Sequence, residues 1–128
     1  MTPEGEARVW TLRLTVSARD EIRTARQRMA EDASEAVADR WQEGLESAIA
    51  TLATFPERGA PAQEAVLFGL PLVRQHVYRR TRRGPAYRIL YRLHESPEDP
   101  PTVVILAVRH GARAPMTQEE AQQIESEQ

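Results

Sequence analysis

The side chains best suited to chemistry in this chain are arginines and histidines, because it contains no cysteine and no lysine. Nine of its 17 arginines fall in residues 72–113, together with all three histidines. A guanidinium binds phosphate or carboxylate through two parallel hydrogen bonds, but it stays protonated and carries protons poorly. Histidine titrates near neutrality. The sequence therefore predicts an anion-binding region in which any acid–base step needs a histidine.

Formal charge is divided unevenly along the chain. Residues 72–113 carry nine arginines and three acids, a balance of +6, whereas residues 1–71 and residues 114–128 each carry −4. The overall charge of −2 therefore hides one basic part and two acidic parts. Because a surface of one sign concentrates partners of the other sign, we expect a partner rich in phosphates or carboxylates.

Length and composition set the general class. A chain of 128 residues predicts one domain, and the absence of cysteine excludes a thiolate nucleophile, a disulfide framework and a cysteine zinc site. We expect no metal and no cofactor, since the histidines are scattered, the acids lack ligand spacing and no glycine-rich phosphate loop is present. No stretch approaches the roughly 20 apolar residues of a membrane span. A cytoplasmic protein without membrane association is expected.

The basic region must be positioned by the elements that precede it. Residues 8–16 alternate between apolar and polar side chains and predict a half-buried strand, which follows a disordered N-terminus at residues 1–7. Ser17 is expected to cap a first helix, and Ser34 a second helix with apolar residues three and four apart. Gly44 lies inside that helix at a cost of about 1 kcal/mol relative to alanine, which indicates close packing against a neighbour.

Three strands are predicted within the basic region, at residues 72–79, 86–93 and 102–108, as an antiparallel meander. Residues 8–113 are thus expected to form one α+β domain: an N-terminal strand, an antiparallel two-helix hairpin, and the meander, with both helices on one face of the sheet. The other face is expected to be open. It would carry Arg74, His76, Arg88 and Arg92.

Two further segments are strongly charged. The turn after the first strand of the meander contains Arg79, Arg80, Arg82 and Arg83, which form either a solvated tip or a phosphate-binding one. Residues 114–128 form an acidic tail or short helix, with a capping-box pattern at Thr117 and Glu120. We expect this tail to fold back over Arg88 and Arg113 as an electrostatic cover.

Three segments in this order resemble the RelE/ParE toxin superfamily. They are residues 55–59 (Phe-Pro-Glu-Arg-Gly), residues 87–91 (Tyr-Arg-Ile-Leu-Tyr) and residues 108–113 (Val-Arg-His-Gly-Ala-Arg). The similarity extends over residues 8–113. It implies the toxin of a type II toxin–antitoxin system, with a cognate antitoxin as partner and a possible hetero-oligomer with it.

The resemblance also implies two mechanisms, because RelE-like members cut mRNA on the ribosome and ParE-like members poison DNA gyrase. On the RelE-like pattern Arg88 and Arg113 are catalytic, with Arg74 and His76 on the preceding strand. Two departures stand against it: RelE-like lysines are replaced here by Arg and His, and no tyrosine follows Tyr91. The wording of the motifs is closer to ParE-like members.

Three functions therefore stay open. A gyrase poison that acts by binding is favoured; the alternatives are a ribosome-dependent mRNA endonuclease and a degenerate or regulatory binding module. If the chain cleaves RNA, the expected catalytic residues are Arg88, Arg113 and His76. Contact with the nucleic acid or protein target is expected from Arg74, Arg79, Arg80, Arg82, Arg83 and Arg92.

Overall fold

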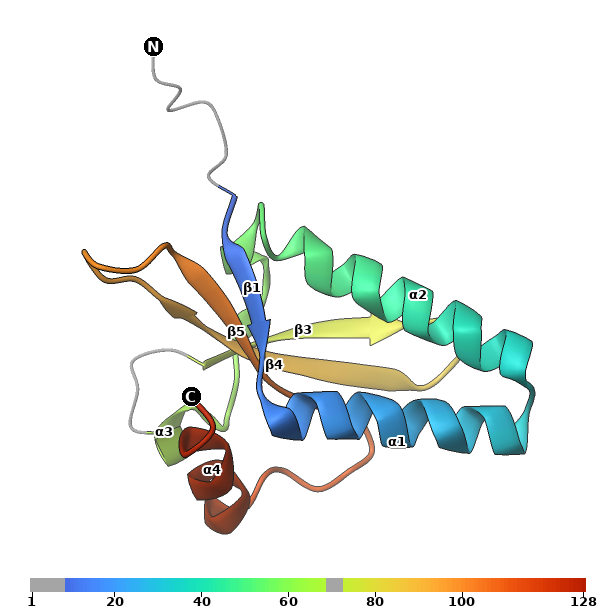
Figure 1. Ribbon diagram of the computed structural model, residues 1–128. Coiled ribbons are helices and arrows are strands. Elements are labelled where there is room, and N and C mark those ends of the chain that lie inside the picture. The colour runs from blue at the N-terminus through green and yellow to red at the C-terminus, as the bar shows by residue number, and fades with distance from the viewer. Residues whose placement is uncertain (1–8, 69–72) are drawn as a thin grey trace.

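The computed structural model describes residues 9–68 and 73–128 (Figure 1). Its elements are β1 (Thr11–Leu14), α1 (Val16–Asp32), α2 (Glu35–Thr51), a 3₁₀ turn (Pro56–Arg58), β2 (Ala60–Pro61), α3 (Ala65–Phe68), β3 (Val73–Arg79), β4 (Ala86–His94), β5 (Thr102–His110) and α4 (Gln118–Glu125). The disorder predicted for residues 1–7 lies outside the described residues. Within the described ranges no helix is both long and apolar enough to cross a bilayer.

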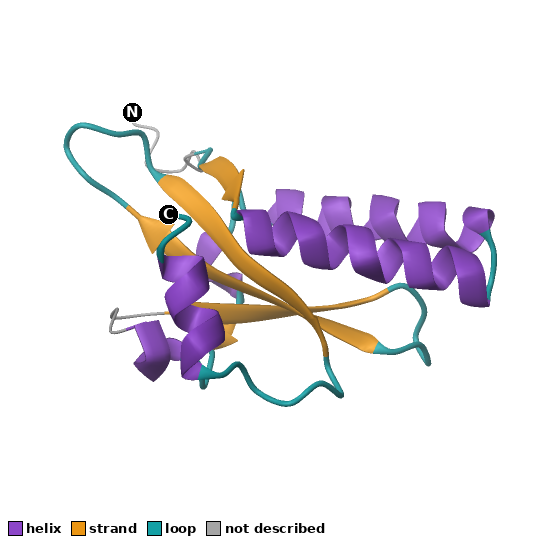
Figure 2. Cartoon of the chain, turned by 60° about the horizontal axis from the view of Figure 1, so that its bottom comes forward, coloured by secondary structure: helices purple, strands orange, loops and turns teal. Residues whose placement is uncertain are grey.

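The strands form one sheet in the order β1-β5-β4-β3-β2. β1 runs parallel to β5, and the α1–α2 hairpin makes the crossover between β1 and the rest of the sheet. β3, β4 and β5 are the predicted antiparallel meander. The α+β fold predicted from the sequence is confirmed, and Figures 1 and 2 show the two long helices side by side along the sheet.

The face of the sheet covered by α1 and α2, which we call the hairpin face, holds the larger core. Trp41, Leu45 and Ile49 project from α2 at helical spacing and are at most 5% exposed. They pack with Tyr87 and Ile89 of β4. Burial of each such side chain stabilises the fold by about 1.5–3 kcal/mol, which fixes the hairpin on this face.

We expected the opposite face to be open, but it is covered. α3 and α4 cover it, so we call it the tail face, and a second core lies beneath them. Its buried residues are Ala62, Val73, Leu90, Val104, Leu106, Ala107, Met116, Ala121 and Ile124. β5 is therefore apolar on both sides, and it is buried at every position except His110.

The predicted grouping of basic residues on one face is wrong. Within each strand the alternation is as expected, but Arg88 pairs with Val77, and His76 pairs with Ile89. Since directly paired residues share a face, Arg88 and Arg92 lie on the tail face, whereas Arg74 and His76 lie on the hairpin face. The error arose because both faces bury apolar side chains, so sequence alternation alone could not fix the relative phase of the two strands.

The ends of the helices differ in part from expectation. Ser34 caps α2 by accepting a hydrogen bond from Val37 N at 3.1 Å, as predicted. α1 is capped by Thr15 instead of Ser17, because β1 ends at Leu14. The Thr15 hydroxyl accepts from Ala18 N at 3.1 Å and donates to Leu106 O at 2.9 Å.

Ser17 is used to hold the C-terminal segment. Its backbone N–H and its hydroxyl donate to the two carboxylate oxygens of Glu127, at 2.9 and 2.8 Å. The predicted capping box of α4 is present, with Thr117 and Glu120 bonded to each other's backbone N–H. Ala121 and Ile124 are at most 3% exposed, so the tail is anchored by apolar packing as well as by charge.

Candidate functional site

Arg88 lies on the tail face of β4 with its guanidinium fork already occupied. Nη1 and Nη2 donate to the two carboxylate oxygens of Glu64, at 2.9 and 2.7 Å, and Nε donates to Gln75 Oε1 at 2.9 Å. The side chains are 12% exposed at Arg88 and 1% at Glu64. A pair this deeply buried is part of the scaffold, because removing either partner leaves an uncompensated charge.

The pKa of the Glu64 carboxyl is shifted by its pairing with Arg88. Burial alone raises its pKa, but the hydrogen bonds and charge of Arg88 outweigh burial and leave the pKa below its ordinary value. Met116 N, on the segment that leads into α4, also lies 3.5 Å from Glu64 Oε2. The ion pair therefore ties β4 to the segments that lead into α3 and α4.

Arg113 lies near the end of a second network that joins α1, β5 and α4. It contacts Glu21 Oε2 at 3.4 Å and Glu120 Oε2 at 2.9 Å. Arg109, which is 2% exposed, contacts the same two atoms at 3.9 and 3.2 Å. Two arginines thus share two carboxylates, and Arg113, at 50% exposure, is the more exposed of the two arginines.

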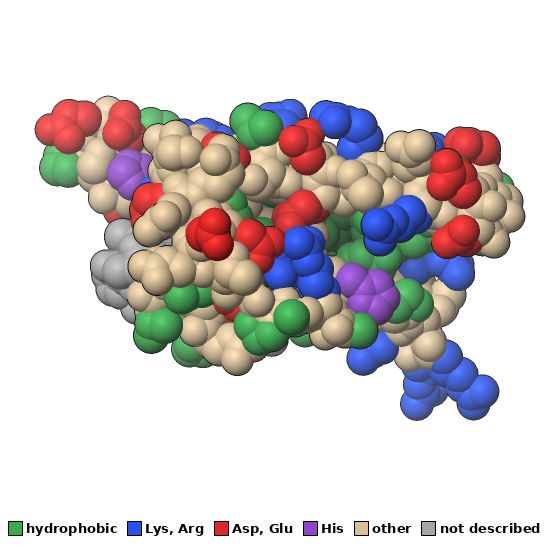
Figure 3. All heavy atoms as spheres, turned by 90° about the horizontal axis from the view of Figure 1, so that it is seen from below, with side chains coloured by type: hydrophobic (Ala, Val, Ile, Leu, Met, Phe, Trp, Pro, Cys, Tyr) green, Lys and Arg blue, Asp and Glu red, His purple; other side chains and the backbone are tan. Residues whose placement is uncertain are grey.

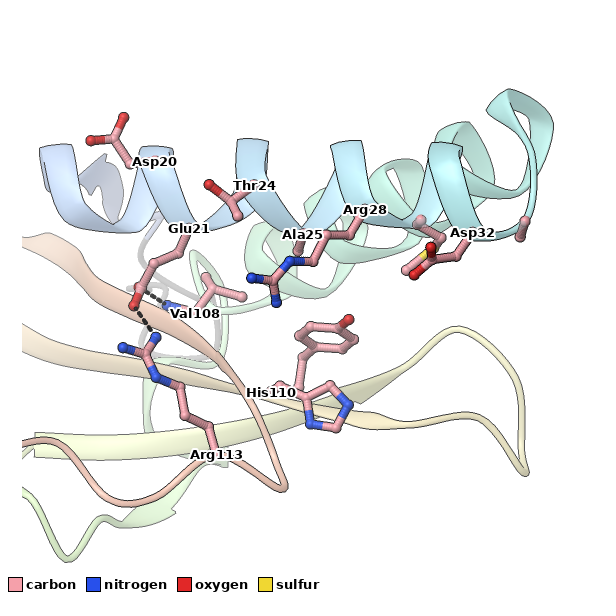
Figure 4. Close-up of a pocket in the computed structure, with 12 residues that line it drawn as sticks. Asp20, Glu21, Thr24, Ala25, Arg28, Asp32, Val108, His110 and Arg113 are labelled. Carbon is pink, nitrogen blue, oxygen red and sulfur yellow. Dashed lines mark hydrogen bonds and ion pairs between the residues drawn. The ribbon is translucent and has the colours of Figure 1, made fainter.

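Glu21 also completes the edge of the sheet. Its Oε1 accepts from Val108 N at 2.9 Å, a backbone donor beyond the end of β1 (Figure 4). Burial raises the pKa of the Glu21 carboxyl, and the opposing effects of Val108, Arg109 and Arg113 do not cancel that rise. The network joins the hairpin to the tail, which is a structural task.

Arg74 and His76 are on the hairpin face, away from Arg88. Arg74 Nη1 donates to the backbone oxygens of Glu57 and Gly59, at 3.2 and 2.8 Å. Burial, followed by the charge of Arg58, lowers the pKa of His76, which favours its neutral form. The structure does not bring His76 and Arg88 together at one site.

The remaining predicted contact residues divide between two places. Arg92 lies on the tail face, bonded to Gln128 Oε1, and burial lowers its pKa. The end of β3 and the turn that follows it present four exposed arginines, Arg79, Arg80, Arg82 and Arg83.

A groove that the sequence reasoning missed lies between α1 and the strands β4 and β5, with a volume of about 770 Å³. It is lined by Asp20, Glu21, Thr24, Ala25, Arg28, Met29, Asp32, Ala33, Tyr87, Val108, His110 and Arg113. Figure 4 shows Arg28 pointing from α1 toward the strands with His110 across from it. Figure 3 shows apolar side chains exposed between basic and histidine side chains on this side of the molecule. The residues that line the groove come from segments far apart in the sequence, so no local sequence pattern could predict the groove.

No group of three His, Cys, Asp or Glu side chains in the described ranges is placed to hold a metal ion. His94 Nε2 lies 3.6 Å from Asp99 Oδ2, beside the β4–β5 turn.

Comparison with protein families gives a match to the ParE toxin of the type II toxin–antitoxin system parDE, over residues 12–115. The chain belongs to the ParE toxin family. It is a toxin of a type II toxin–antitoxin system, and an antitoxin is its partner. A comparison with curated proteins found no match.

The three motifs that suggested this family have structural roles in the toxin. The Tyr91 hydroxyl donates to Pro56 O at 2.6 Å and accepts from Gly59 N at 3.0 Å, which joins the first motif to the second. A Cβ at Gly59 would lie 2.6 Å from that hydroxyl. In the third motif, Gly111 N donates to Ala86 O at 2.7 Å. The three motifs therefore make contacts that hold β4 to the 3₁₀ turn and to the end of β5.

Proposed function

We propose that the toxin inhibits growth by binding DNA gyrase and poisoning it, without cleaving a substrate of its own. The observation that carries this proposal is the separation of His76 from Arg88 by the sheet. Cleavage of RNA by its own 2′-hydroxyl needs a base, an acid and cations around one phosphate. A histidine on the hairpin face and an arginine on the tail face cannot serve the same phosphate.

The existing ion pairs of the arginines support the same proposal. Arg88 uses its fork on Glu64, and Arg113 shares the carboxylates of Glu21 and Glu120. A phosphate at Arg88 would have to displace Glu64 and leave that carboxylate buried without a partner, which is costly. Binding to a protein target requires no such exchange.

His110 deserves a separate test because it lies in the groove with Arg28 and Arg113. Its Nδ1 accepts from Ala112 N at 3.0 Å, and its ring packs edge-on against Tyr87 with centroids 5.2 Å apart. Both contacts fix the ring in place. A groove with apolar and charged walls suits a protein segment, since protein interfaces combine an apolar centre with a polar rim.

Purified components test the proposal. The toxin is added to gyrase with plasmid DNA and ATP, and in parallel to translating ribosomes with a reporter mRNA. We expect trapped, cleaved DNA in the first reaction, intact mRNA in the second, and reversal of the first by the antitoxin. His110→Gln should leave mRNA intact as well. Cleavage of mRNA by the wild type but not by this variant would make the groove an RNA-cleaving site and overturn the proposal.

This mode of action places the toxin in the cytoplasm, where gyrase and its DNA are found.

A further inference from the structure

The tip of the β3–β4 hairpin concentrates positive charge on a narrow element. Arg79, Arg80, Arg82 and Arg83 fall within five positions, and all four are exposed. The other residues of the turn are Thr81, Gly84 and Pro85, so it contains no acid. Figure 3 shows basic side chains on a projection that stands out from the body of the molecule.

No carboxylate in the described part of the chain pairs with the arginines of this tip. Arg79 Nη1 donates to Gly84 O at 2.7 Å, and Gly84 N donates to Thr81 O at 3.1 Å, which shapes the turn. Within residues 9–68 and 73–128, none of the four tip arginines lies within 4.0 Å of a carboxylate oxygen. By contrast, Arg88, Arg109 and Arg113 are all paired.

We propose that this hairpin tip binds the phosphate backbone of duplex DNA. Each free guanidinium can neutralise one phosphate and release its counterion. A two-stranded ribbon is also narrow enough to enter the major groove. Protein interfaces instead depend on buried aromatic or aliphatic anchors, and the turn from Arg79 to Pro85 presents no large apolar side chain.

The charge of the rest of the chain favours an approach through the tip alone. Residues 1–71 and residues 114–128 each carry a net charge of −4 and repel a polyanion. Duplex DNA would therefore meet the toxin end-on at the hairpin. This inference goes beyond the proposed function, because it requires only DNA and no gyrase.

Fluorescence anisotropy with a labelled 20-base-pair duplex measures the interaction directly, with the full chain and salt varied from 50 to 200 mM. Three to four phosphate contacts give a slope of log K against log salt of about −2.7 to −3.6, or a loss of affinity on the order of 40- to 150-fold across that range. The triple variant Arg80→Gln, Arg82→Gln, Arg83→Gln should reduce the slope by about 3. It retains Arg79, which shapes the turn.

A matched control removes the same charge elsewhere, at the exposed residues Arg13, Arg19 and Arg23. This control should bind DNA within about threefold of the wild type, because unpaired tip charge, not net charge, carries the contact. Equal binding by the wild type and the tip variant would overturn the inference. If the tip variant bound DNA as the wild type does but no longer bound DNA-free gyrase subunits, the tip would instead contact an acidic protein surface. Neither result depends on whether gyrase is poisoned.

Discussion

Arg88 and His76 occupy adjacent strands but opposite faces of the sheet, because the register pairs Arg88 with Val77 and His76 with Ile89. Arg88 is then free to meet Glu64 beneath the tail, while His76 stays on the hairpin side. The sequence suggested that Arg88 and His76 act together in a phosphate-cleaving site. The register places them in two separate parts of the structure. This relationship is the main support for the binding mechanism proposed above.

Breaking the Arg88–Glu64 pair should destabilise the fold. Arg88→Ala leaves Glu64 charged and 1% exposed, so we expect a loss of about 3–5 kcal/mol in the free energy of unfolding, measured by urea denaturation. Arg83→Ala, at the exposed hairpin tip, is the control and should change stability by less than about 0.5 kcal/mol. A similarly small effect at Arg88 would mean that the pair is exposed to water in solution.

Acid should weaken the same pair. The folded state holds the pKa of Glu64 below its ordinary value of 4.5, so the ionised carboxylate stabilises the fold above that pH. This contribution is lost as the pH falls from 4.5 through the lower, folded-state pKa. Stability should therefore fall more steeply with acid in the wild type than in Glu64→Gln, which has no proton to bind at that site. Parallel curves for the two proteins below pH 4.5 would contradict this assignment.

The tail should behave as part of the core. Ile124 of α4 is 3% exposed and packs into the core of the tail face, so Ile124→Ala should reduce the free energy of unfolding by about 2–4 kcal/mol. Glu125→Ala, at the next and exposed position, is the matched control and should have little effect. If both substitutions were equally mild, α4 would be only loosely docked in solution.

Gly44 and Tyr78 should be coupled. A Cβ at Gly44 would lie 2.2 Å from Tyr78 Oη, which donates to Trp41 O at 3.0 Å. Gly44→Ala should thus destabilise the fold by about 1–2 kcal/mol, even though alanine favours a helix by about 1 kcal/mol. In a Tyr78→Phe background the same substitution should be less harmful, since the hydroxyl is absent. Simple additivity in this double-mutant cycle would argue against the contact.

The sequence predicted those elements whose signals are local. The Ser34 cap, the helical spacing of Trp41 and Leu45, and the close packing at Gly44 are all confirmed. The fold-back of the tail toward Arg113 is also confirmed by the contact with Glu120. These features needed only periodicity, capping chemistry and charge.

What could not be predicted depends on contacts between distant segments. Glu64 lies in a loop 24 positions before Arg88, and nothing in its neighbours marks it as a buried partner. The phase between β3 and β4 was ambiguous for a related reason, because Val73 is buried beneath a tail whose apolar stripe contains only Ala121 and Ile124. The groove at Arg28 and His110 likewise exists only after α1 packs beside β5.

The most direct test of the binding mechanism follows two signals in the same cells after the toxin is induced without its antitoxin. We expect gyrase-linked DNA breaks and the DNA-damage response to rise while full-length mRNA is still intact. An Arg88→Lys variant that folds should remain toxic, because Arg88 serves the scaffold and not a substrate phosphate. Early loss of full-length mRNA, before any DNA breaks and abolished by Arg88→Lys at unchanged stability, would contradict the mechanism and restore an RNA-cleaving one.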